Sequence, residues 1–160
     1  MLCQLSNGRI NFRRGKGMCI QSLRRAALIV QNYNCYYCEF PIWESDCEGF
    51  ARTHGISTKL ARRFRATAEH LIPRCEGGPD TRGNIVAACL HCNTARHRPA
   101  VPLGHEDYKA RVSQAIKKRK WHPASAYGRL AAAARSVRKH PGSTSAQCLA
   151  KFPTASARAL

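Results

Sequence analysis

The sequence predicts a small α+β domain in which one β-hairpin lies among basic amphipathic helices. Two segments, 66–73 and 83–88, have the length and apolar content of short strands, and the turn-forming run Gly77-Gly78-Pro79-Asp80 lies between them. Segments on both sides of this hairpin place apolar residues at spacings of three and four, which is typical of helices with one buried face. These observations place strands and helices in one α+β unit.

Two helices are expected before the hairpin, at residues 19–33 and 57–67. The first has one apolar face, made by Ile20, Leu23, Ala27 and Val30. The second begins at the potential N-cap Ser57 and carries basic side chains around most of its circumference. Both helices therefore expose cations to solvent while they bury a narrow apolar stripe.

Three helices are expected after the hairpin. The first, residues 90–98, stops before Pro99, because the residue that precedes a proline disfavours the helical conformation. The second, residues 105–121, ends in four consecutive cations, where the helix dipole favours positive charge. The third, residues 125–139, is rich in alanine, and the composition of residues 141–160 predicts a disordered tail.

Lysine and arginine outnumber acidic residues by 27 to 9 among 160 residues, which gives a formal net charge of +18 and a pI near 10.2. Residues 1–34 hold six basic and no acidic residues, residues 35–100 nine and seven, and residues 101–160 twelve and two. The expected partner is therefore a polyanion, and charge alone fits nucleic acid, an anionic membrane surface or an acidic protein. Solvated helix faces that happen to be basic are the alternative interpretation.

The chain is expected to have four parts: a basic N-terminal arm with one helix (1–34), a domain that holds the hairpin (35–104), a basic helical extension (105–140) and a disordered tail (141–160). This length excludes a large two-domain enzyme. The longest apolar run has six residues, whereas roughly 20 are needed to cross a bilayer. We therefore expect a soluble, cytoplasmic protein with no membrane partner.

Two Cys-x-x-Cys pairs bracket the hairpin, Cys35 with Cys38 and Cys89 with Cys92. Each pair can present two thiolates to one tetrahedral ion, so together they predict a closed, structural four-cysteine zinc site. A redox motif, a disulfide and unrelated buried cysteines are the alternatives, although neither pair has the full βαβ context of a redox motif. Nine cysteines cannot all pair in disulfides. The other five show no partner spacing, although one of them, Cys47, could reach a metal: Cys3, Cys19, Cys47, Cys75 and Cys148.

A second pattern overlaps these pairs and consists, in chain order, of Glu69-His70, Pro73, Gly77-Gly78, Asn84, Cys89-Leu90-His91-Cys92-Asn93 and His97. It resembles the HNH endonuclease family, in particular its zinc-binding branch with four cysteine ligands, over about residues 35–98. The resemblance implies the ββα-metal (His-Me finger) fold, which binds one divalent ion between strand and helix. It also implies cleavage of phosphodiester bonds.

Phosphodiester hydrolysis needs a base for the attacking water, a cation for the charge that develops on the phosphate, and donors that hold the phosphate. The resemblance assigns the role of base to His70, a residue type that titrates in the useful range. It assigns the orienting role to Asn84, which lies on the paired strand and can hydrogen-bond across the hairpin. Arg74 and Arg96 are candidates for phosphate contacts.

The resemblance assigns the catalytic divalent ion to Glu69, Asn93 and His97. Asn93 and His97 are four residues apart on one expected helix, so their side chains face the same way. Glu69 stands where the family more often has Asp, which leaves the reach of its carboxylate to the metal open. The oxygen ligands suit Mg²⁺, and the histidine also admits Mn²⁺, Ni²⁺ or Zn²⁺.

We therefore expect a metal-dependent HNH endonuclease that acts on DNA, with basic helices that supply phosphate affinity. The alternatives are a catalytically silent, zinc-braced module that binds nucleic acid, a nuclease directed at RNA and a toxin-like effector. The joint presence of His70, Asn84 and Asn93 argues against the silent module, because a decayed site is expected to lose at least one of them.

Overall fold

The computed structural model of this chain describes residues 19–130. Its helices and strands are, in chain order, α1 (Ile20–Val30), α2 (Cys47–His54), α3 (Thr58–Ala61), β1 (Ala66–His70), β2 (Ile85–Cys89), α4 (Leu90–Arg96) and α5 (His105–Lys117). Two 3₁₀ turns, η1 (Arg62–Phe64) and η2 (Arg74–Glu76), follow α3 and β1, and residues 124–130 are helical. None of the helices in this described range is long and apolar enough to span a membrane.

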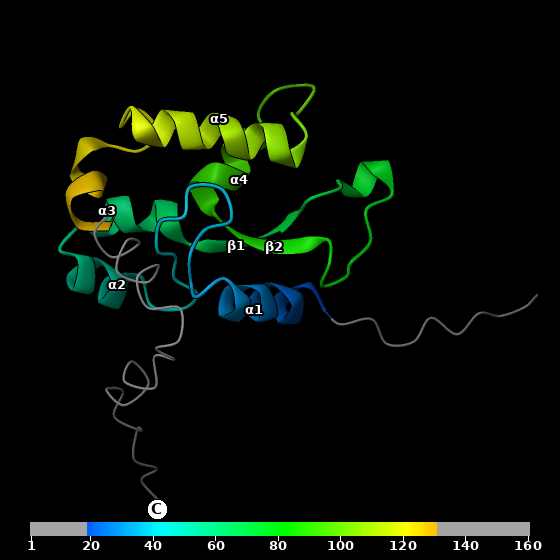
Figure 1. Ribbon diagram of the computed structural model, residues 1–160. Coiled ribbons are helices and arrows are strands. Elements are labelled where there is room, and N and C mark those ends of the chain that lie inside the picture. Colours follow the sequence, from blue (N-terminus) through cyan, green and yellow to red (C-terminus); the bar gives the residue numbers. More distant parts are fainter. Residues whose placement is uncertain (1–18, 131–160) are drawn as a thin grey trace, which may run out of the picture.

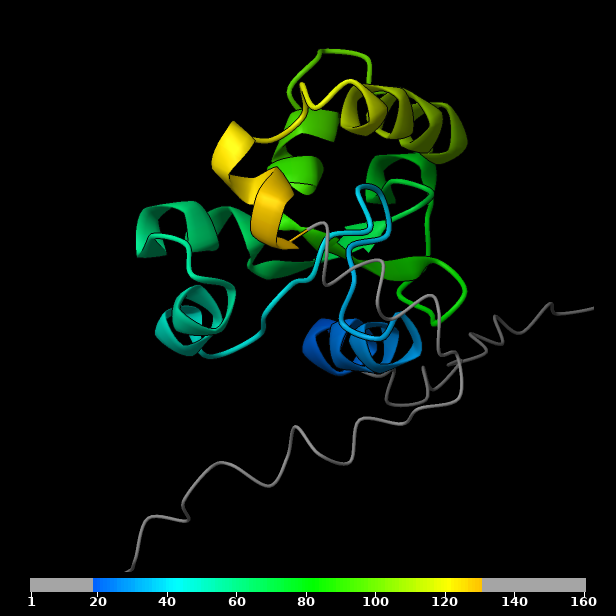
Figure 2. The same cartoon turned by 60° about the vertical axis from the view of Figure 1, so that its left-hand side comes forward.

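The two strands form an antiparallel hairpin at the centre of the molecule (Figure 1). Helix α1 packs on one side of this hairpin and α4 on the other, and α5 lies beyond α4. Helices α2 and α3 lie together at one end of the hairpin, as a view turned by 60° also shows (Figure 2). This mixed helix and sheet arrangement is consistent with the α+β class that the sequence predicts.

The hairpin register pairs Ala66 with Cys89 at one end and His70 with Ile85 at the other. Alanines occupy much of both strands, and Ala87 and Ala88 are fully buried. Their small side chains let helices approach the hairpin closely from both sides, which explains why the strands lack a simple alternation of buried and exposed residues. Both predicted strands are therefore confirmed, with β1 ending at His70, three residues earlier than expected.

The helices before the hairpin agree only in part with the sequence-based expectation. Helix α1 is confirmed and buries Leu23 and Leu28. The helix expected at 57–67 ends earlier, since α3 passes into η1 and the chain is extended from residue 65. Tertiary contacts explain the early end: the backbone of Trp43 bonds to Phe64 and to Ala66 on either side of Arg65.

Helix α2 was not expected from the sequence. Asp46 caps its N-terminus, with a carboxylate oxygen that accepts from the backbone N–H of Gly49 at 2.7 Å. Gly55 ends it with φ +57°, the left-handed conformation that glycine adopts at low cost. Both signals are visible in the sequence, but the eight residues between them show no clear apolar stripe.

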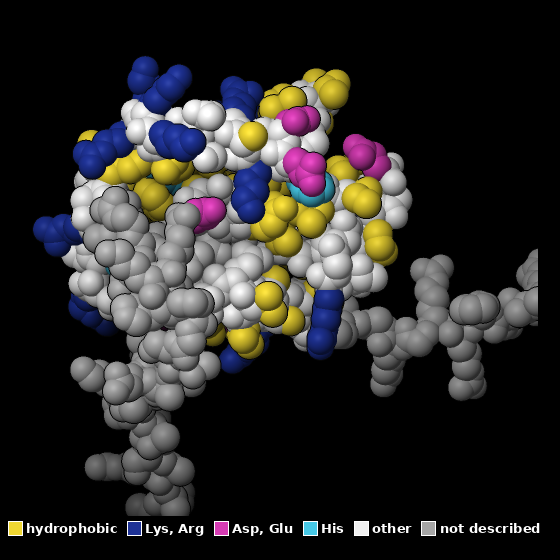
Figure 3. Space-filling view, in the orientation of Figure 1, with side chains coloured by type: hydrophobic (Ala, Val, Ile, Leu, Met, Phe, Trp, Pro, Cys, Tyr) yellow, Lys and Arg dark blue, Asp and Glu magenta, His cyan; other side chains and the backbone are white. Residues whose placement is uncertain are grey.

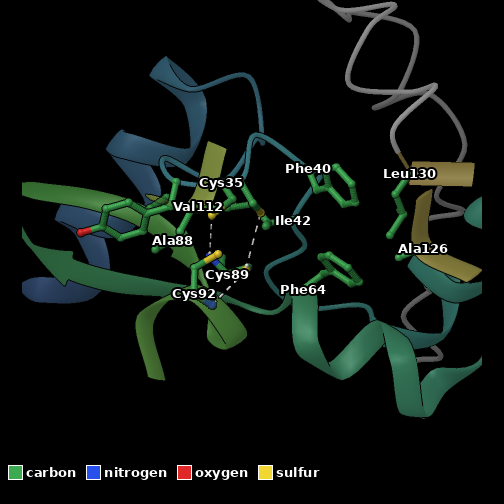
Figure 4. Packing of buried hydrophobic residues seen from close by; sticks show 14 of the residues in the cluster. Cys35, Phe40, Ile42, Phe64, Ala88, Cys89, Cys92, Val112, Ala126 and Leu130 are labelled. Carbon is green, nitrogen blue, oxygen red and sulfur yellow. Dashed lines mark hydrogen bonds between the residues drawn. The ribbon is translucent and has the colours of Figure 1, made fainter. Parts of the chain in front are cut away.

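The hydrophobic core runs from the cysteine pairs to the helical segment at the end of the described range (Figure 4). Phe40 and Phe64 stack with ring centroids 6.1 Å apart, close to Ala126 and Leu130. On the side of α5, Val112 is fully buried in the same cluster. The helical extension that follows residue 104 therefore shares one core with the hairpin.

Helices α4 and α5 lie within the ranges predicted for them and end a few residues earlier. Of the Ala-rich helix expected at 125–139, residues 124–130 are described and helical. The rest of that helix, the tail at 141–160 and the first 18 residues of the N-terminal arm lie outside the described residues.

Candidate active site and metal centre

Four cysteines form a closed cluster between the hairpin, α4 and the loop that follows α1. The sulfur atoms of Cys35, Cys38, Cys89 and Cys92 all lie within 4.8 Å of one another, and each residue is at most 4% exposed. Four thiolates around a tetrahedral zinc, with bonds of about 2.3 Å, are about 3.8 Å apart. The spacing, burial and ligand chemistry therefore fit a structural zinc ion, as the two Cys-x-x-Cys pairs predict.

Neighbouring N–H groups donate hydrogen bonds to three of these sulfur atoms. The backbone N–H of Cys89 donates to Sγ of Cys35 at 3.2 Å, and that of Cys92 donates to Sγ of Cys89 at 3.3 Å. The indole N–H of Trp121 donates to Sγ of Cys92 at 3.2 Å. Such donors stabilise thiolate charge, as expected of a site that holds a metal through sulfur.

The four thiols share one buried volume, so their ionisation is linked. Burial raises the pKa of Cys38 and Cys92 well above the ordinary thiol value. Burial also opposes ionisation of Cys35, but hydrogen bonds from the other three thiols outweigh it and lower the Cys35 pKa well below that value. Because cysteines bind a metal ion as thiolates, binding of zinc at this cluster would release protons.

The hypothesis that Cys47 reaches this metal is wrong for the described structure. Cys47 begins α2, and its thiol donates to the backbone carbonyl of Thr58 at 3.8 Å. Cys19 and Cys75 are exposed free thiols, and the cluster contains neither of them.

His70 lies at the end of β1 with its side chain 16% exposed. Its Nε2 is 2.7 Å from Oδ1 of Asp80 and 3.2 Å from Nε of Arg74. Arg74 donates from Nη2 to Oδ2 of the same carboxylate at 2.6 Å, and its side chain is 61% exposed. Hydrogen bonds from His70 and Arg74 lower the pKa of Asp80 below its ordinary value. At neutral pH the imidazole therefore faces an ionised carboxylate.

Asn84 fastens the loop between the strands and is 5% exposed. Its side-chain oxygen accepts from the backbone N–H of Ile72 at 2.8 Å, and its amide donates to the carbonyls of Ile72 and Pro79. Gly78 allows this packing, since a Cβ there would lie 1.8 Å from the carbonyl oxygen of Ile72. Asn84 thus holds the loop that carries Asp80, rather than the ring of His70.

Glu69, the residue before His70, is 1% exposed. Its Oε1 accepts hydrogen bonds from the hydroxyl of Tyr37 at 3.0 Å and from Nη1 of Arg96. Nε2 of His97 lies 3.1 Å from both Oε1 and Oε2. The guanidinium of Arg96 is the cationic neighbour that can offset a negative charge on this buried carboxylate.

Arg96 does not occupy the position of a phosphate ligand. It is 2% exposed, and its guanidinium also donates to the backbone carbonyls of His70, Leu71 and Leu103. These bonds join α4 to the end of β1 and to the segment that precedes α5. We therefore do not retain Arg96 as a phosphate contact, because its donors are directed into the protein.

Asn93 and His97 both lie on the side of α4 that faces β1. The side-chain amide of Asn93 donates to Oγ1 of Thr67 at 3.0 Å and to the carbonyl of Ala68 at 3.2 Å. His97 is 39% exposed and contacts the Glu69 carboxylate. The structure thus brings Glu69 and His97 together and places Asn93 one helical turn before His97. A carboxylate and an imidazole are ligand types that Mn²⁺, Ni²⁺ or Zn²⁺ accept, whereas oxygen ligands such as the carboxylate and a nearby amide suit Mg²⁺.

Two neighbours of the site were missed by sequence reasoning. The sequence pattern marks Asp80 only as a turn residue, although a carboxylate ten residues after a candidate base is a visible signal. Tyr37, inside the first Cys-x-x-Cys pair, gave no signal that its hydroxyl would reach Glu69, 32 residues away.

Exposed cations occur on many parts of the described surface, including α1, α2 and the segment around α3, and two further groups lie on other elements. One group surrounds the C-terminal end of α5 and includes Lys117, Lys118, Arg119 and Lys120 (Figure 3). The other consists of Arg74, whose Nε lies 3.2 Å from Nε2 of His70, with Arg82 in the loop before β2 and Arg98 two residues after α4. Both groups offer phosphate contacts without a defined pattern for base recognition.

Comparison with protein families gives one match: residues 58–98 fit the model described as HNH endonuclease. The match runs from α3 past the end of α4, so it includes the hairpin, the loop with Asp80 and the second Cys-x-x-Cys pair. The first pair, Cys35 and Cys38, lies outside it, and the four-cysteine cluster is compatible with the zinc-binding branch of that family. No curated protein and no solved structure matches the chain.

Proposed function

We propose that this chain, which carries an HNH endonuclease domain at residues 58–98, is a metal-dependent endonuclease that hydrolyses phosphodiester bonds in DNA. One observation supports the proposal most directly. His70 ends β1 beside the buried Glu69, whose carboxylate lies 3.1 Å from Nε2 of His97, the residue that follows α4. A potential base and a potential divalent-ion ligand are therefore consecutive residues at the end of β1.

His70 acts as the general base in this proposal. Its imidazole is partly exposed, so a water molecule and a phosphodiester can approach it from solvent. The water oxygen forms a bond to phosphorus, its proton passes to the imidazole, and the bond from phosphorus to the leaving ester oxygen breaks. A positioned base of this kind accelerates hydrolysis by about 10²- to 10⁴-fold.

Glu69, His97 and the side-chain oxygen of Asn93 would hold the divalent ion. When bound, the ion supplies a positive charge that stabilises the charge developing on the phosphate and the leaving oxygen. Arg96 neutralises part of the Glu69 carboxylate, so the protein alone offers little net negative charge. An ion such as Mg²⁺ would keep several waters and gain further ligands from the substrate phosphate.

The four cysteines would hold a second ion, zinc, with a structural role. Cys89 caps α4 and Cys92 lies in its first turn, so a metal at this cluster would fix the start of the helix that carries Asn93 and His97. The zinc would thus hold the N-terminal end of α4 in place, and Arg96 would hold its C-terminal end. Together they would position the metal ligands Asn93 and His97. Free buried thiols of this kind fit a reducing compartment, so we propose a cytoplasmic location.

DNA binding would depend mainly on charge. The chain has a net charge of +18, and exposed cations lie both beside His70 and around the end of α5. Contacts of lysine and arginine with phosphates supply affinity that is independent of sequence and falls steeply with salt. We therefore propose an endonuclease with phosphate-directed binding.

The test is cleavage of supercoiled plasmid DNA by purified protein with EDTA, Mg²⁺ or Mn²⁺, beside the His70→Ala variant as a control. We expect nicked or linear DNA with the divalent ion and none with EDTA or with the variant. Single-stranded and folded RNA in the same assay distinguish a DNA-directed from an RNA-directed nuclease. Protein that binds plasmid but cuts neither substrate with Mg²⁺, Mn²⁺, Ni²⁺ or Zn²⁺ would contradict the proposal and favour the silent binding module.

A further inference from the structure

We infer that Asp80 is a positioning residue for the His70 base and that it fixes which ring nitrogen of His70 receives the proton from water. The inference rests on the proposed function and deepens it. Asp80 lies in the loop between η2 and β2, and its carboxylate links two side chains. Oδ1 is 2.7 Å from Nε2 of His70, and Oδ2 is 2.6 Å from Nη2 of Arg74.

The charge of Asp80 decides where the imidazole proton lies. An ionised carboxylate only accepts hydrogen bonds, so a neutral His70 must carry its proton on Nε2 in order to bond Oδ1. The opposite tautomer would place a nitrogen lone pair against the carboxylate at 2.7 Å. It would gain only a bond of 3.2 Å from Nε of Arg74. The shorter, charge-assisted hydrogen bond from Nε2 to Asp80 therefore determines the tautomer: Nε2 carries the proton and Nδ1 keeps its lone pair.

This tautomer gives His70 the form that a base needs. Among the described residues Nδ1 makes no hydrogen bond, whereas Nε2 is held by Asp80. The proton lost by the attacking water goes to Nδ1, and the proton on Nε2 stays in its bond to the carboxylate. Asp80 then faces an imidazolium, which it stabilises by charge, and it takes up no proton itself.

The loop structure keeps Asp80 in place. The amide of Asn84 donates to the carbonyl of Pro79 at 3.0 Å, directly before Asp80, and to that of Ile72 at 3.1 Å. The backbone N–H of Thr81 bonds to the carbonyl of Pro79 at 3.0 Å. Asp80 is thus held on both sides although its own side chain is 42% exposed. The orienting role expected of Asn84 would reach His70 through this carboxylate.

The first test reads the tautomer of His70 without any substrate. In ¹⁵N-labelled protein at alkaline pH, where imidazoles are neutral, the protonated ring nitrogen resonates far upfield of the bare one. Comparison with a His70→Gln spectrum assigns the signals. We expect the proton on Nε2 in the wild type and in Asp80→Asn, whose amide oxygen still accepts, and a mixture of tautomers in Asp80→Ala. A wild-type proton on Nδ1 would overturn the inference.

The second test separates positioning from a general effect of charge. Asp80→Ala should lower kcat for plasmid cleavage by about 10- to 100-fold, less than loss of the base itself, with KM little changed. Asp80→Asn should recover part of that loss. Glu76→Gln is the matched control, because it removes an exposed negative charge from the end of η2, four residues before Asp80, and should leave kcat as in the wild type. Thermal melting of each variant checks that the fold is intact.

The two hypotheses fail in different ways. Wild-type protein that cuts no nucleic acid overturns the proposed function, and the role of Asp80 with it. An active wild type in which Asp80→Ala retains full kcat, or loses no more than Glu76→Gln, overturns the positioning role and leaves the nuclease intact.

Discussion

Trp121 donates its indole N–H to Sγ of Cys92 at 3.2 Å, so the segment that follows α5 is attached to the four-cysteine cluster. The ring also packs edge-on against Tyr108 of α5, with centroids 6.0 Å apart. The cluster therefore connects three parts of the chain: the first cysteine pair, the start of α4 and the region after α5. A metal at this position would stabilise the extension as well as the hairpin.

The first prediction concerns this metal and its tryptophan contact. Purified protein should contain about one zinc ion per molecule, because four thiolates at this spacing form a closed site. Trp121→Phe keeps an aromatic ring but removes the donor to sulfur. Loss of such outer contacts typically lowers metal affinity by about 10- to 100-fold. Competition with a chromophoric chelator measures that affinity.

A control for this prediction is Cys92→Ser, which removes a ligand itself and should cost folding as well as zinc. Protein prepared without chelator that contains no zinc would contradict the structural site. Equal zinc affinity of the wild type and Trp121→Phe would show that the indole contributes only packing.

The second prediction concerns the ion pair of Glu69 and Arg96, both 1% exposed in their side chains. Arg96→Met keeps most of the side-chain volume but leaves the Glu69 carboxylate uncompensated in the interior. Removing one partner of a buried pair usually costs about 3–5 kcal/mol of unfolding free energy. Urea denaturation measures this loss. Arg98→Met, an exposed arginine two residues away, should change stability by less than about 0.5 kcal/mol.

The third prediction concerns the two glycines that differ most in their surroundings within the loop. A Cβ at Gly78 would lie 1.8 Å from the carbonyl oxygen of Ile72 and 2.9 Å from Nδ2 of Asn84, whereas one at Gly83 would meet nothing within 4 Å. Gly78→Ala should therefore displace the loop, with a stability loss of about 1–3 kcal/mol and reduced cleavage. Gly83→Ala should be nearly neutral. Similar melting temperatures for both variants would refute this account of the loop.

Features that depend on local spacing could be predicted from the sequence. The hairpin, α1 and α4 follow from patterns within a few residues, and the four-cysteine cluster follows from a paired spacing that is typical of zinc sites. Arg96 was misjudged because an arginine in a basic chain resembles a surface residue, and its partner Glu69 lies 27 residues away. The link between Asp80 and His70 was missed because it depends on how the loop folds back, which Asn84 and Gly78 determine through tertiary contacts.

The fourth prediction concerns the cations at the end of α5. The variant for this test replaces Lys117, Lys118 and Lys120 with alanine. Arg119 is not replaced, because it has φ +53°, a conformation that few side chains adopt easily. If these lysines bind DNA, the slope of log affinity against log salt should become shallower by about 0.9 for each phosphate that they no longer neutralise. Fluorescence anisotropy in the His70→Ala background measures binding without cleavage. An unchanged slope would place the DNA elsewhere on the surface.

The last prediction separates the roles of His70 and Asn93, which lie on β1 and α4 at one end of the hairpin. His70→Ala should leave zinc content, folding and DNA affinity nearly intact, since the imidazole is partly exposed and bonded only to the loop. Its cleavage rate should fall by about 10²- to 10⁴-fold at every metal concentration, because no divalent ion replaces a base.

Asn93→Ala should produce a different defect. The base remains, but a divalent-ion ligand is removed. The hydrogen bonds that the Asn93 side-chain amide donates to Thr67 and Ala68, which orient this side of α4, are lost as well. We therefore expect a higher Mg²⁺ or Mn²⁺ concentration for half-maximal cleavage, with much of the rate recovered at excess metal. Thr94→Ala, at the exposed neighbouring position on α4, is the control for a change in the helix. A higher metal concentration can compensate for a missing metal ligand but not for a missing base. If excess metal restores the cleavage rate of His70→Ala and not that of Asn93→Ala, the assigned roles of base and ligand are therefore reversed.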